Sequence, residues 1–273
     1  PARRVVLAST AALAALLALP LVHSPGAGSA DTPGNLTIRV MDVGQGDAIL
    51  LDPPGGAPIL VDSGPSQAHV AARLRELRAG ALAALVVTHD QSDHAGGVAE
   101  LIRSNHPGHL VLAAGSPRLA ALAGAGGPDL TRLGEGGELR SAELRLSVLW
   151  PPRELLGMRG EDPNQLSLVL LAEWRHFSML LTADAEAELA RIDPGPVDVL
   201  KVAHHGSGDA GLDALLAQAA PRLAVISVGE NSYGHPAAQT LSDLAEHDVP
   251  VARTDRDGEI VIEVDPAGWR VGQ

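Results

Sequence analysis

The sequence contains no cysteine, and it has few aromatic residues and no excess of basic side chains over its 273 residues. The absence of cysteine excludes disulfides, thiolate zinc sites and cysteine nucleophiles. Aromatic residues make up 2% of the chain, with a single Tyr and a single Phe, so the core must be built from Leu, Val and Ala. The net charge of −13 provides no general basic face for nucleic acid, and any phosphate chemistry therefore needs a local site.

The N-terminal segment is the clearest targeting feature. Arg3 and Arg4 precede an uncharged apolar run over residues 5–22, which is at the short end for a membrane span. It fits a signal peptide with small residues for cleavage at 28–30, or a membrane anchor whose basic end stays in the cytoplasm; a buried soluble helix is the third interpretation. The first two place the rest of the chain outside the cytoplasmic membrane. We predict a transmembrane helix or signal segment over 1–23, a Gly/Pro/Ser/Ala linker over 24–35 and one domain over 36–273.

Short apolar segments alternate with helices and loops in the first half of this domain. The segments LTIRVMDV, DAILLD and PILVD follow one another closely and predict three antiparallel strands. The other predicted elements are a helix over 67–78, a strand over 84–88, a helix from about residue 95, a strand over 109–114, a helix over 116–124 and one short strand within the glycine-rich region 124–137.

The second half repeats this plan. Strands are predicted over 143–150, 166–174, 177–184, 197–203, 223–228, 249–253, 259–264 and 269–272, and helices over 185–192, 212–219 and 237–247. Strand pairs followed by strand–helix units, occurring twice, indicate an α/β fold in which two sheets are stacked between helical layers.

Polar clusters follow several of these strands. THDQSDHAGG brings His89, Asp93 and His94 into one turn, and the next residues open a helix. Imidazole and carboxylate are ligands for Zn²⁺, and carboxylates also suit Mn²⁺ or Mg²⁺. The alternative is a helix capped by Asp93 beside solvated histidines. Asp184, in LLTADAE, also follows a strand and alone would be explained as a helix N-cap.

Two further motifs shift the balance toward a metal site. KVAHHGSG places His204 and His205 directly after a strand, and paired imidazoles in a loop seldom serve packing. YGHP adds His235 in a loop before a helix, where a solvated histidine is the alternative. Because loops at strand ends commonly carry binding residues, these clusters predict one site at one edge of the sheets.

The motifs DVGQGDAILL, LVDSGP, THDQSDHAGG, LLTADAE, VLKVAHHGS, NSYGHP and RTDRDGEI occur in the order found in ComEC-type competence proteins. The resemblance covers about residues 36–264. The C-terminal domain of those proteins belongs to the metallo-β-lactamase superfamily, so the resemblance implies an αββα sandwich, a divalent-metal site and phosphodiester cleavage. It also implies that the N-terminal apolar segment is the last membrane helix before that domain.

The resemblance assigns roles residue by residue. His89, Asp93 and His94 match the superfamily ligands H-x-H-x-D-H, with Gln91 in place of the second histidine. Asp184 matches the aspartate that bridges two metals, and His204, or less favourably His205, matches the late histidine. Asp62 matches a carboxylate that orients a ligand histidine. The middle histidine of the superfamily is absent, and Asn164 is the nearest candidate to replace it. Leu166 stands where the family often has a second Asn.

These assignments imply two unequal metal positions. One has Asp93, His94, Asp184 and His204, whereas the other has His89 and the shared Asp184 plus amide oxygens from Gln91 or Asn164. Replacing imidazole by amide oxygen disfavours Zn²⁺ and favours the harder Mn²⁺ or Mg²⁺. We therefore expect one or two divalent ions, Mn²⁺ or Zn²⁺ with Mg²⁺ as an alternative.

The expected reaction is metal-assisted hydrolysis of a phosphodiester. Asp93 orients the attacking water, and His235 or His205 donates a proton to the leaving sugar oxygen. Ser207 and backbone amides near it are expected to hold phosphate. Gln45 and Asp47 are either substrate-binding residues at the same edge or plain turn residues.

Three functions compete. The first is a membrane-anchored, extracytoplasmic nuclease that degrades one strand of single- or double-stranded DNA during uptake, working with a membrane channel portion of the same protein or with other competence proteins. The second is a catalytically weak domain that guides DNA or contacts other uptake proteins, which Gln91 and the net charge of −13 favour. The third is a secreted metallohydrolase acting on lactones or small phosphoesters, since fold alone does not determine substrate.

Overall fold

The computed structural model describes residues 34–272 except 114, 125, 157, 159–161, 189 and 191. The predicted segment 1–23 and all but the last two residues of the predicted linker 24–35 therefore lie outside the described residues. Among the described residues, no helix combines the length and the apolar character needed to cross a membrane.

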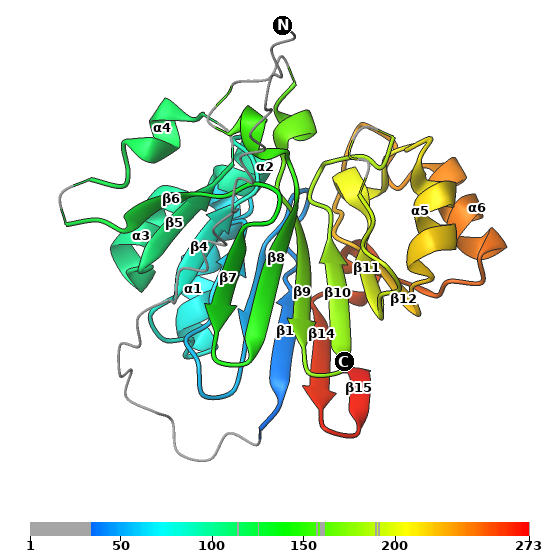
Figure 1. Cartoon of the computed structure of the whole chain (residues 1–273), viewed down its shortest axis with the longest axis horizontal. Coiled ribbons are helices and arrows are strands. Elements are labelled where there is room, and N and C mark those ends of the chain that lie inside the picture. The colour runs from blue at the N-terminus through cyan, green and yellow to red at the C-terminus, as the bar shows by residue number, and fades with distance from the viewer. Residues whose placement is uncertain are drawn as a thin grey trace, which may run out of the picture.

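The first sheet of the described region has the strand order β15-β14-β1-β2-β3-β4-β5-β6 (Figure 1). Its strands are β1 (Leu36–Val40), β2 (Ile49–Asp52), β3 (Ile59–Val61), β4 (Ala84–Val87), β5 (His109–Leu112), β6 (Asp129–Arg132), β14 (Ile260–Asp265) and β15 (Gly268–Gly272). The predicted antiparallel pairing of the first three strands is confirmed, since β1 pairs with β2 and β2 with β3 in that sense. β3, β4 and β5 then run parallel, so their carboxyl ends lie at one edge.

The second sheet has the order β13-β12-β11-β10-β9-β8-β7. Its strands are β7 (Glu138–Ser141), β8 (Leu144–Trp150), β9 (Val169–Trp174), β10 (Phe177–Leu181), β11 (Val199–Lys201), β12 (Leu223–Ile226) and β13 (Val251–Arg253). β10, β11, β12 and β13 are parallel, so the loops that follow them gather at one edge of this sheet as well.

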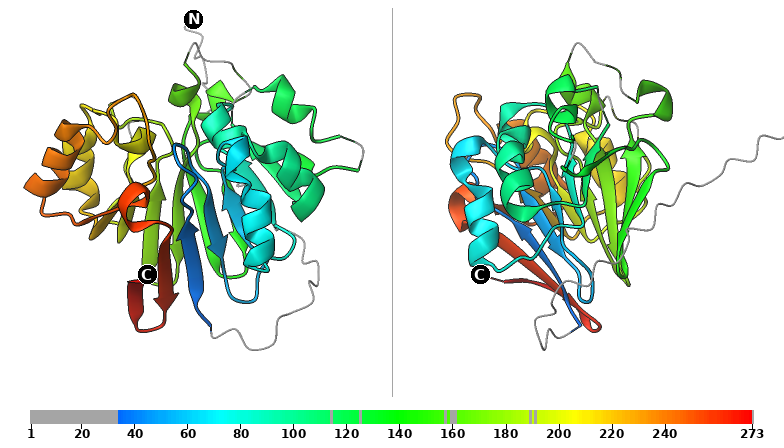
Figure 2. Two further views of the ribbon diagram at one scale, coloured as in Figure 1. Left: turned by 180° about the vertical axis from the view of Figure 1, so that it is seen from behind. Right: turned by 90° about the vertical axis from the view of Figure 1, so that its left-hand side faces the viewer.

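The helices cover the outer faces of the two sheets. They are α1 (Val70–Glu76), α2 (Ser92–Ala95), α3 (Val98–Asn105), α4 (Pro117–Ala120), α5 (Leu212–Ala219), α6 (Ala238–Glu246) and α7 (Thr254–Asp257). One apolar cluster joins α1 and α3 to the first sheet, and another joins α5 to the second (Figures 1 and 2). A third cluster fills the space between the sheets, which gives the predicted αββα sandwich.

The central core is aliphatic, as the scarcity of aromatic residues predicts. Strand β1 alternates buried and half-buried positions, while β4 is buried on both faces, as expected for a strand covered by a helix on one side and a sheet on the other. Trp174 and Phe177 are the aromatic side chains among the large, fully buried residues of the described region.

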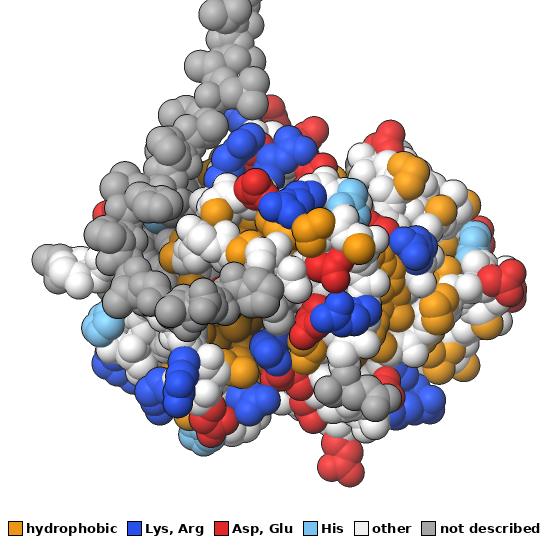
Figure 3. Space-filling model, turned by 90° about the horizontal axis from the view of Figure 1, so that it is seen from below, with side chains coloured by type: hydrophobic (Ala, Val, Ile, Leu, Met, Phe, Trp, Pro, Cys, Tyr) orange, Lys and Arg blue, Asp and Glu red, His pale blue; other side chains and the backbone are white. Residues whose placement is uncertain are grey.

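The surface opposite the strand-end loops is of mixed charge. Lys and Arg side chains are intermixed there with Asp and Glu, so this face is not a broad basic surface (Figure 3).

Two predicted helices differ from the structure. The helix predicted over 185–192 is wrong: the described residues of this segment form turns, because the N–H groups of Ala187 and Glu188 donate to the carboxylate of Asp209. The helix predicted over 67–78 is shorter, because His69 adopts a left-handed conformation with φ of 51° and α1 begins after it.

Candidate metal centre

The predicted site residues lie in loops that follow the carboxyl ends of strands in both sheets. Asp62 follows β3, His89 follows β4, Asp184 follows β10, and His204 and His205 follow β11. The sandwich therefore brings together side chains that are far apart in the sequence. Asp93 and His94 join them from the short helix α2.

Asp184 lies at the centre of this group and is buried, with an exposed fraction of 1%. Its Oδ1 atom lies 3.2 Å from His94 Nε2 and 3.7 Å from His205 Nε2. Asp93 Oδ2 lies 3.4 Å from the same His205 nitrogen and 3.9 Å from His94 Nε2. These four side chains therefore surround one small volume with two nitrogen and two oxygen donors.

The second oxygen of Asp184 faces two other imidazoles. Oδ2 lies 3.8 Å from His89 Nε2 and 3.9 Å from His204 Nε2. The two adjacent histidines thus lie on different sides of Asp184. His205, rather than the predicted His204, shares the volume bounded by Asp93 and His94, because both residues of the pair have left-handed backbone conformations that turn their side chains apart.

A buried carboxylate fixes the orientation of the first two histidines. Asp62 Oδ2 accepts hydrogen bonds of 2.8 Å from His94 Nδ1–H and from the hydroxyl of Thr88, and Asp62 Oδ1 accepts from the Thr88 N–H. Since the Thr88 hydroxyl proton is given to Asp62, Thr88 Oγ1 can only accept from His89 Nδ1–H, 3.1 Å away. In the neutral form that a metal ion requires, both imidazoles therefore present an unprotonated Nε2 toward Asp184.

The other two histidines are held through their Nδ1 atoms as well. His205 Nδ1–H donates to the backbone carbonyl of Ser227 at 2.9 Å, and His204 Nδ1–H donates to Glu186 Oε1 at 3.0 Å. Hydrogen bonds of this kind fix the tautomer and the ring orientation of metal-binding histidines. Sequence reasoning missed Thr88, Glu186 and Ser227, because nothing local in the sequence indicates these long-range contacts.

The polar atoms that point into the centre have no hydrogen-bond partner. They are buried, and they are Asp47 Oδ1, His89 Nε2, His94 Nε2, His205 Nε2 and both carboxylate oxygens of Asp184. Buried polar atoms are almost always hydrogen-bonded, so a convergent group of unpaired acceptors requires a partner. Ligand atoms of Asp47, His94, Asp184 and His205 lie within 4.8 Å of one another, and this set of nitrogen and oxygen donors fits a divalent metal ion.

Asp47 does not take the substrate-binding role predicted for it. Its exposed fraction is 1%, and its carboxylate forms an ion pair with Lys201, which is fully buried and also donates to the carbonyl of Ala183 at 3.1 Å. A carboxylate that balances a buried ammonium is a poor additional metal ligand, because a metal ion would compete with that cation. Sequence reasoning missed Lys201, although a lysine within an apolar strand is an indication of a buried pair.

The two amides at the positions of the absent superfamily histidines bond to each other. Gln91 Nε2–H donates to Asn164 Oδ1 at 2.7 Å, and Asn164 Nδ2–H lies 3.4 Å from His204 Nε2. The pair lies on the His89 side of Asp184. Beyond its imidazoles, this side of the centre therefore offers amides, which are weaker donors than the carboxylate of Asp93.

The charges of the centre favour a bound cation. Burial lowers the pKa of His89 to about 3, so this imidazole is neutral at physiological pH. Burial acts to raise the pKa of Asp184 and of Asp93, yet the nearby charge of His94 and the interaction with His205 hold both carboxyl groups below their ordinary pKa. Burial acts to lower the pKa of His94, yet the charges of Asp184 and Asp62 raise it well above its ordinary value. The ionised carboxylates thus favour positive charge in this buried volume, which a bound cation would supply in place of the His94 proton.

Four residues in the loops around the centre have left-handed backbone conformations. Asp62, Ala183, His204 and His205 have φ values of 60°, 48°, 49° and 54°. Left-handed conformations at residues other than glycine cost roughly 1 kcal/mol or more each and persist where the surrounding structure enforces them. Similar conformations occur elsewhere in the described chain, but these four lie in the loops that carry the metal-binding side chains.

The remaining predicted residues lie at the periphery of the centre. Ser207 is buried and its hydroxyl donates to Glu186 at 2.5 Å, so the structure does not present it to a phosphate. The ring of His235 lies 5.5 Å from that of His204, and burial lowers the pKa of His235. Gln45 lines an open hollow together with Gln91 and Asp93.

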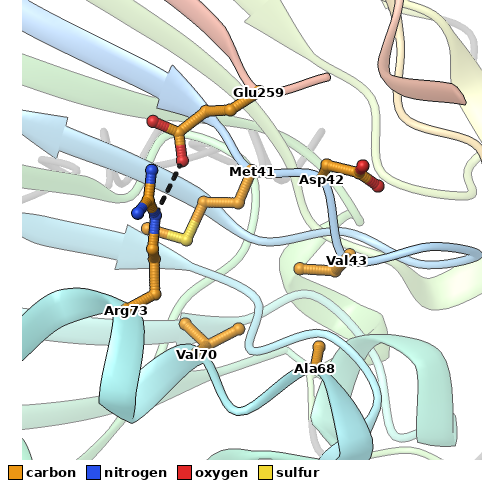
Figure 4. A pocket seen from close by; sticks show the side chains of 7 residues that line it. All are labelled: Met41, Asp42, Val43, Ala68, Val70, Arg73 and Glu259. Atoms are coloured by element: carbon orange, nitrogen blue, oxygen red, sulfur yellow. Dashed lines mark hydrogen bonds and ion pairs between the residues drawn. The ribbon is translucent and has the colours of Figure 1, made fainter. Parts of the chain in front are cut away.

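A separate, smaller hollow of about 200 Å³ lies away from these residues, between the β1–β2 loop and α1 (Figure 4). Arg73 and Glu259 form an ion pair across it, and Met41 and Val70 line it. It contains no histidine and does not adjoin the metal ligands.

Comparisons with known proteins agree with the fold. A family model described as the metallo-beta-lactamase superfamily matches residues 41–164. ComE operon protein 3 of Bacillus subtilis is 29% identical over 82% of this chain, and Recombination protein 2 of Haemophilus influenzae is 30% identical over 82% of it. The chain spans 32% and 28% of the lengths of these two relatives.

Solved structures show the same architecture. The metallo-beta-lactamase fold protein YhfI of Bacillus subtilis superposes with a TM-score of 0.60, at 12% identity, over 85% of this chain and 100% of its own. CmlA, a diiron beta-hydroxylase of Streptomyces venezuelae, superposes with a TM-score of 0.54, at 14% identity, over 89% of this chain and 55% of its own. One of these two proteins is a beta-hydroxylase, so the fold alone does not identify a substrate, which has to be argued from the site.

Proposed function

This chain is related to the ComEC-type competence proteins and carries a metallo-β-lactamase domain, and on that premise we propose that it is a metal-dependent nuclease. Its substrate would be one strand of DNA during uptake. The observation that carries the proposal is the convergence of unpaired, buried donor atoms of His94, His205 and Asp184 on one volume. The partly exposed Asp93 borders this volume, with Oδ2 at 3.4 Å from His205 Nε2. A metal centre next to an open hollow provides what phosphodiester hydrolysis needs.

In this proposal, Asp93, His94, Asp184 and His205 hold one divalent ion. His89, with His204 and the amides of Gln91 and Asn164, provides a weaker second position on the other oxygen of Asp184. We expect Mn²⁺ or Zn²⁺ at the first position and the harder Mn²⁺ or Mg²⁺ at the second, because amide oxygens suit hard cations. A divalent ion bound here would acidify a water molecule and stabilise negative charge on the phosphate oxygens.

The protein's own groups then orient the reactants. Asp93 is partly exposed and its carboxylate borders both the centre and the hollow, so it can accept a hydrogen bond from the attacking water. The ring of His235 lies 5.5 Å from that of His204, and its lowered pKa makes its protonated ring a stronger acid than free imidazole. It can therefore pass a proton to the leaving sugar oxygen, as general-acid catalysis requires.

We propose a location for the domain from the same relationship. The chain would be attached to the cell membrane through its N-terminal segment, with the metallo-β-lactamase domain outside the cytoplasm. Its partners would be DNA and a membrane channel, formed by another portion of the same protein or by other competence proteins.

A second function, a catalytically weak domain that guides DNA, is favoured by one observation. Gln91 and Asn164 are hydrogen-bonded to each other, and neither amide has a donor strength comparable to the imidazoles that the superfamily places there. If the weaker metal position is essential for cleavage, DNA binding would survive in this chain while turnover would be low.

The test is metal content and DNA cleavage measured on one preparation of the full chain, purified in detergent. We expect bound divalent metal and EDTA-sensitive cleavage of single-stranded DNA in Mn²⁺. Asp184→Asn should lose metal and reduce cleavage by at least about 100-fold, because it removes charge from the shared ligand. Asp198→Asn, a matched change before β11 at the far end of the sheet, should leave both unchanged.

The competing functions give different results. DNA binding without cleavage, unaffected by Asp184→Asn, would support the guiding domain. Turnover of a small phosphodiester or a lactone without DNA cleavage would indicate a small-ester hydrolase. A preparation that neither holds metal nor cleaves DNA would refute the nuclease proposal.

A further inference from the structure

An open hollow of about 520 Å³ adjoins the metal centre. Gln91 and Asp93 from the metal-binding loop line one part of it, Gln45 another, and Asn231 and Tyr233 from the loop after β12 a third. Its volume falls within the range of small-molecule sites, and Asp93 belongs to both the hollow and the centre. Whatever occupies the hollow therefore lies next to the reacting phosphate.

Tyr233 is the single tyrosine of the chain and is 75% exposed. It is the most exposed of the large hydrophobic side chains in the described part of the chain. Because the ring lines the hollow and is not packed against the protein, it is available to stack on a ligand there.

The backbone that carries this ring is firmly held. Asn231 Nδ2 donates to the carbonyls of Gly229 and His235 at 2.8 and 2.9 Å. Its Oδ1 accepts from the N–H groups of Tyr233 and His235 at 3.1 and 3.0 Å. One amide side chain thus closes the loop with four hydrogen bonds. The exposed ring is therefore presented on an organised loop, which reduces the entropy lost on ligand binding.

Neighbouring rings connect Tyr233 to the metal ligands. Its ring centroid lies 5.7 Å from that of His235, which lies 5.5 Å from that of His204. His204 Nε2 is in turn 3.9 Å from Asp184 Oδ2. The exposed ring is thus only two side chains away from the residue that both metal positions share.

The polarity of the hollow indicates which part of a nucleotide it fits. None of the described residues that line it is Lys or Arg, and Asp93 and Glu230 are acidic. A phosphate would be repelled there, whereas a neutral planar group with hydrogen-bonding edges would face the amides of Gln45, Gln67 and Gln91. A nucleobase has this chemistry, and every base has a face on which an aromatic ring can stack.

We propose that Tyr233 forms a nucleobase subsite, stacking on the base next to the phosphodiester that lies at the metal centre. This inference rests on the proposed nuclease function and specifies how the strand is held. The site would accept an unpaired base, because a base within a duplex is already stacked on its neighbours. Recognition would tolerate different sequences, since stacking does not read the hydrogen-bonding pattern of a base.

The test compares Tyr233→Ala, Tyr233→Phe and the wild-type full chain on two single-stranded oligonucleotides of equal length. One is a normal DNA oligonucleotide, and the other carries abasic sites throughout. We expect Tyr233→Ala to lower kcat/KM on the normal oligonucleotide by about tenfold, within the roughly 5- to 160-fold that stacking of one base provides, mainly through KM. Tyr233→Phe should retain wild-type activity. On the abasic oligonucleotide the wild type and Tyr233→Ala should be equal.

The matched control is Leu130→Ala, which removes an apolar side chain that is 40% exposed on strand β6. It should leave kcat/KM unchanged on both oligonucleotides. Equal losses for Tyr233→Ala on the normal and abasic oligonucleotides, or no loss on either, would overturn the subsite while leaving the nuclease function standing.

Binding of the same oligonucleotides, followed by fluorescence anisotropy, separates the subsite from the nuclease function. If the wild-type chain binds normal DNA without cleaving it, a tenfold weaker Kd for Tyr233→Ala would support the subsite although the nuclease function had failed. An unchanged Kd in that case would overturn the subsite too. A wild-type chain that neither binds nor cleaves DNA would overturn both.

Discussion

Replacing Asp62 by Asn should reverse the tautomer of His94 and weaken metal binding. The new side chain has nearly the same shape, and Asn tolerates the left-handed φ of 60° at this position. Its carbonyl oxygen can still accept from the Thr88 N–H. Its NH₂ group, however, would face two donors, His94 Nδ1–H and the Thr88 hydroxyl, each 2.8 Å from the present carboxylate oxygen.

The conflict is relieved if His94 moves its proton to Nε2. The Nε2 lone pair that now points at Asp184 Oδ1 across 3.2 Å would then be lost to a metal ion. Loss of a carboxylate that orients a metal-binding histidine typically weakens metal affinity about 10- to 100-fold, or roughly 1.4–2.8 kcal/mol. Hydrogen bonds to a charged group contribute about 1.5–3 kcal/mol to folding.

The loss of folding stability should fall at the low end of that range. Burial raises the pKa of Asp62, so its ionised form already carries a desolvation cost that the neutral amide does not have. We expect Tm to fall by about 3–8 °C, given roughly 2–4 °C per kcal/mol for a domain of this size.

The assay is calorimetric titration of Mn²⁺ and Zn²⁺ into the full chain, with a parallel thermal melt. The control is Asp198→Asn, because the Asp198 carboxylate also accepts buried hydrogen bonds, from Ser178 N–H and Trp269 Nε1–H at 3.0 Å, but at the opposite ends of the strands. It should lower Tm and leave the metal Kd unchanged. Wild-type metal affinity in a folded Asp62→Asn variant would refute the tautomer argument.

Three further changes test other parts of the centre. His205→Ala should remove the more tightly bound ion, whereas His204→Ala should leave it in place. Metal content after dialysis measures this difference, and equal losses in both variants would contradict the assignment of His205 and His204 to different metal positions. Gln91→His should raise Zn²⁺ affinity at the weaker position by about tenfold or more, read as a second equivalent in a Zn²⁺ titration, because imidazole is the better zinc ligand; one equivalent before and after would count against it. In denaturant unfolding, Gly46→Ala should destabilise the fold by roughly 1–3 kcal/mol more than Gly55→Ala, because a Cβ at residue 46 would lie 2.3 Å from the carbonyl oxygen of Asp93. Gly55 is the control, since it also has a positive φ but open space around it. Equal losses of stability would show that the contact with Asp93 is irrelevant.

Strand positions and the location of the site could be predicted because they depend on local patterns. Apolar runs of the right length mark the strands, and polar residues directly after them mark the edge where parallel strands end. Asp62, His89 and Asp184 could therefore be assigned to one site from the sequence. The αββα arrangement followed from the repeated order of strands and helices.

Details that depend on distant partners could not be predicted in this way. The sequence HHG does not show that His204 and His205 both take left-handed conformations, and this geometry decides which ring faces Asp93. Asp47 resembles an exposed turn residue until Lys201, from the other sheet, is placed against it. The segment 185–192 has a helical pattern, but the carboxylate of Asp209 binds its amides instead.

The distribution of charge explains why the two metal positions should differ in more than ligand type. Asp47 is balanced by Lys201, so the ionised groups left to face a cation are Asp93 and Asp184. One divalent ion neutralises these two carboxylates. A second ion on the His89 side would share Asp184 and gain only neutral donors, and buried uncompensated charge is costly. A phosphodiester carries the missing negative charge, so the second ion and the DNA strand should bind together, each raising the affinity for the other by the same factor. Under the proposed nuclease function, the replacement of histidine by Gln91 would therefore make full occupancy of the centre depend on substrate and leave the first position intact.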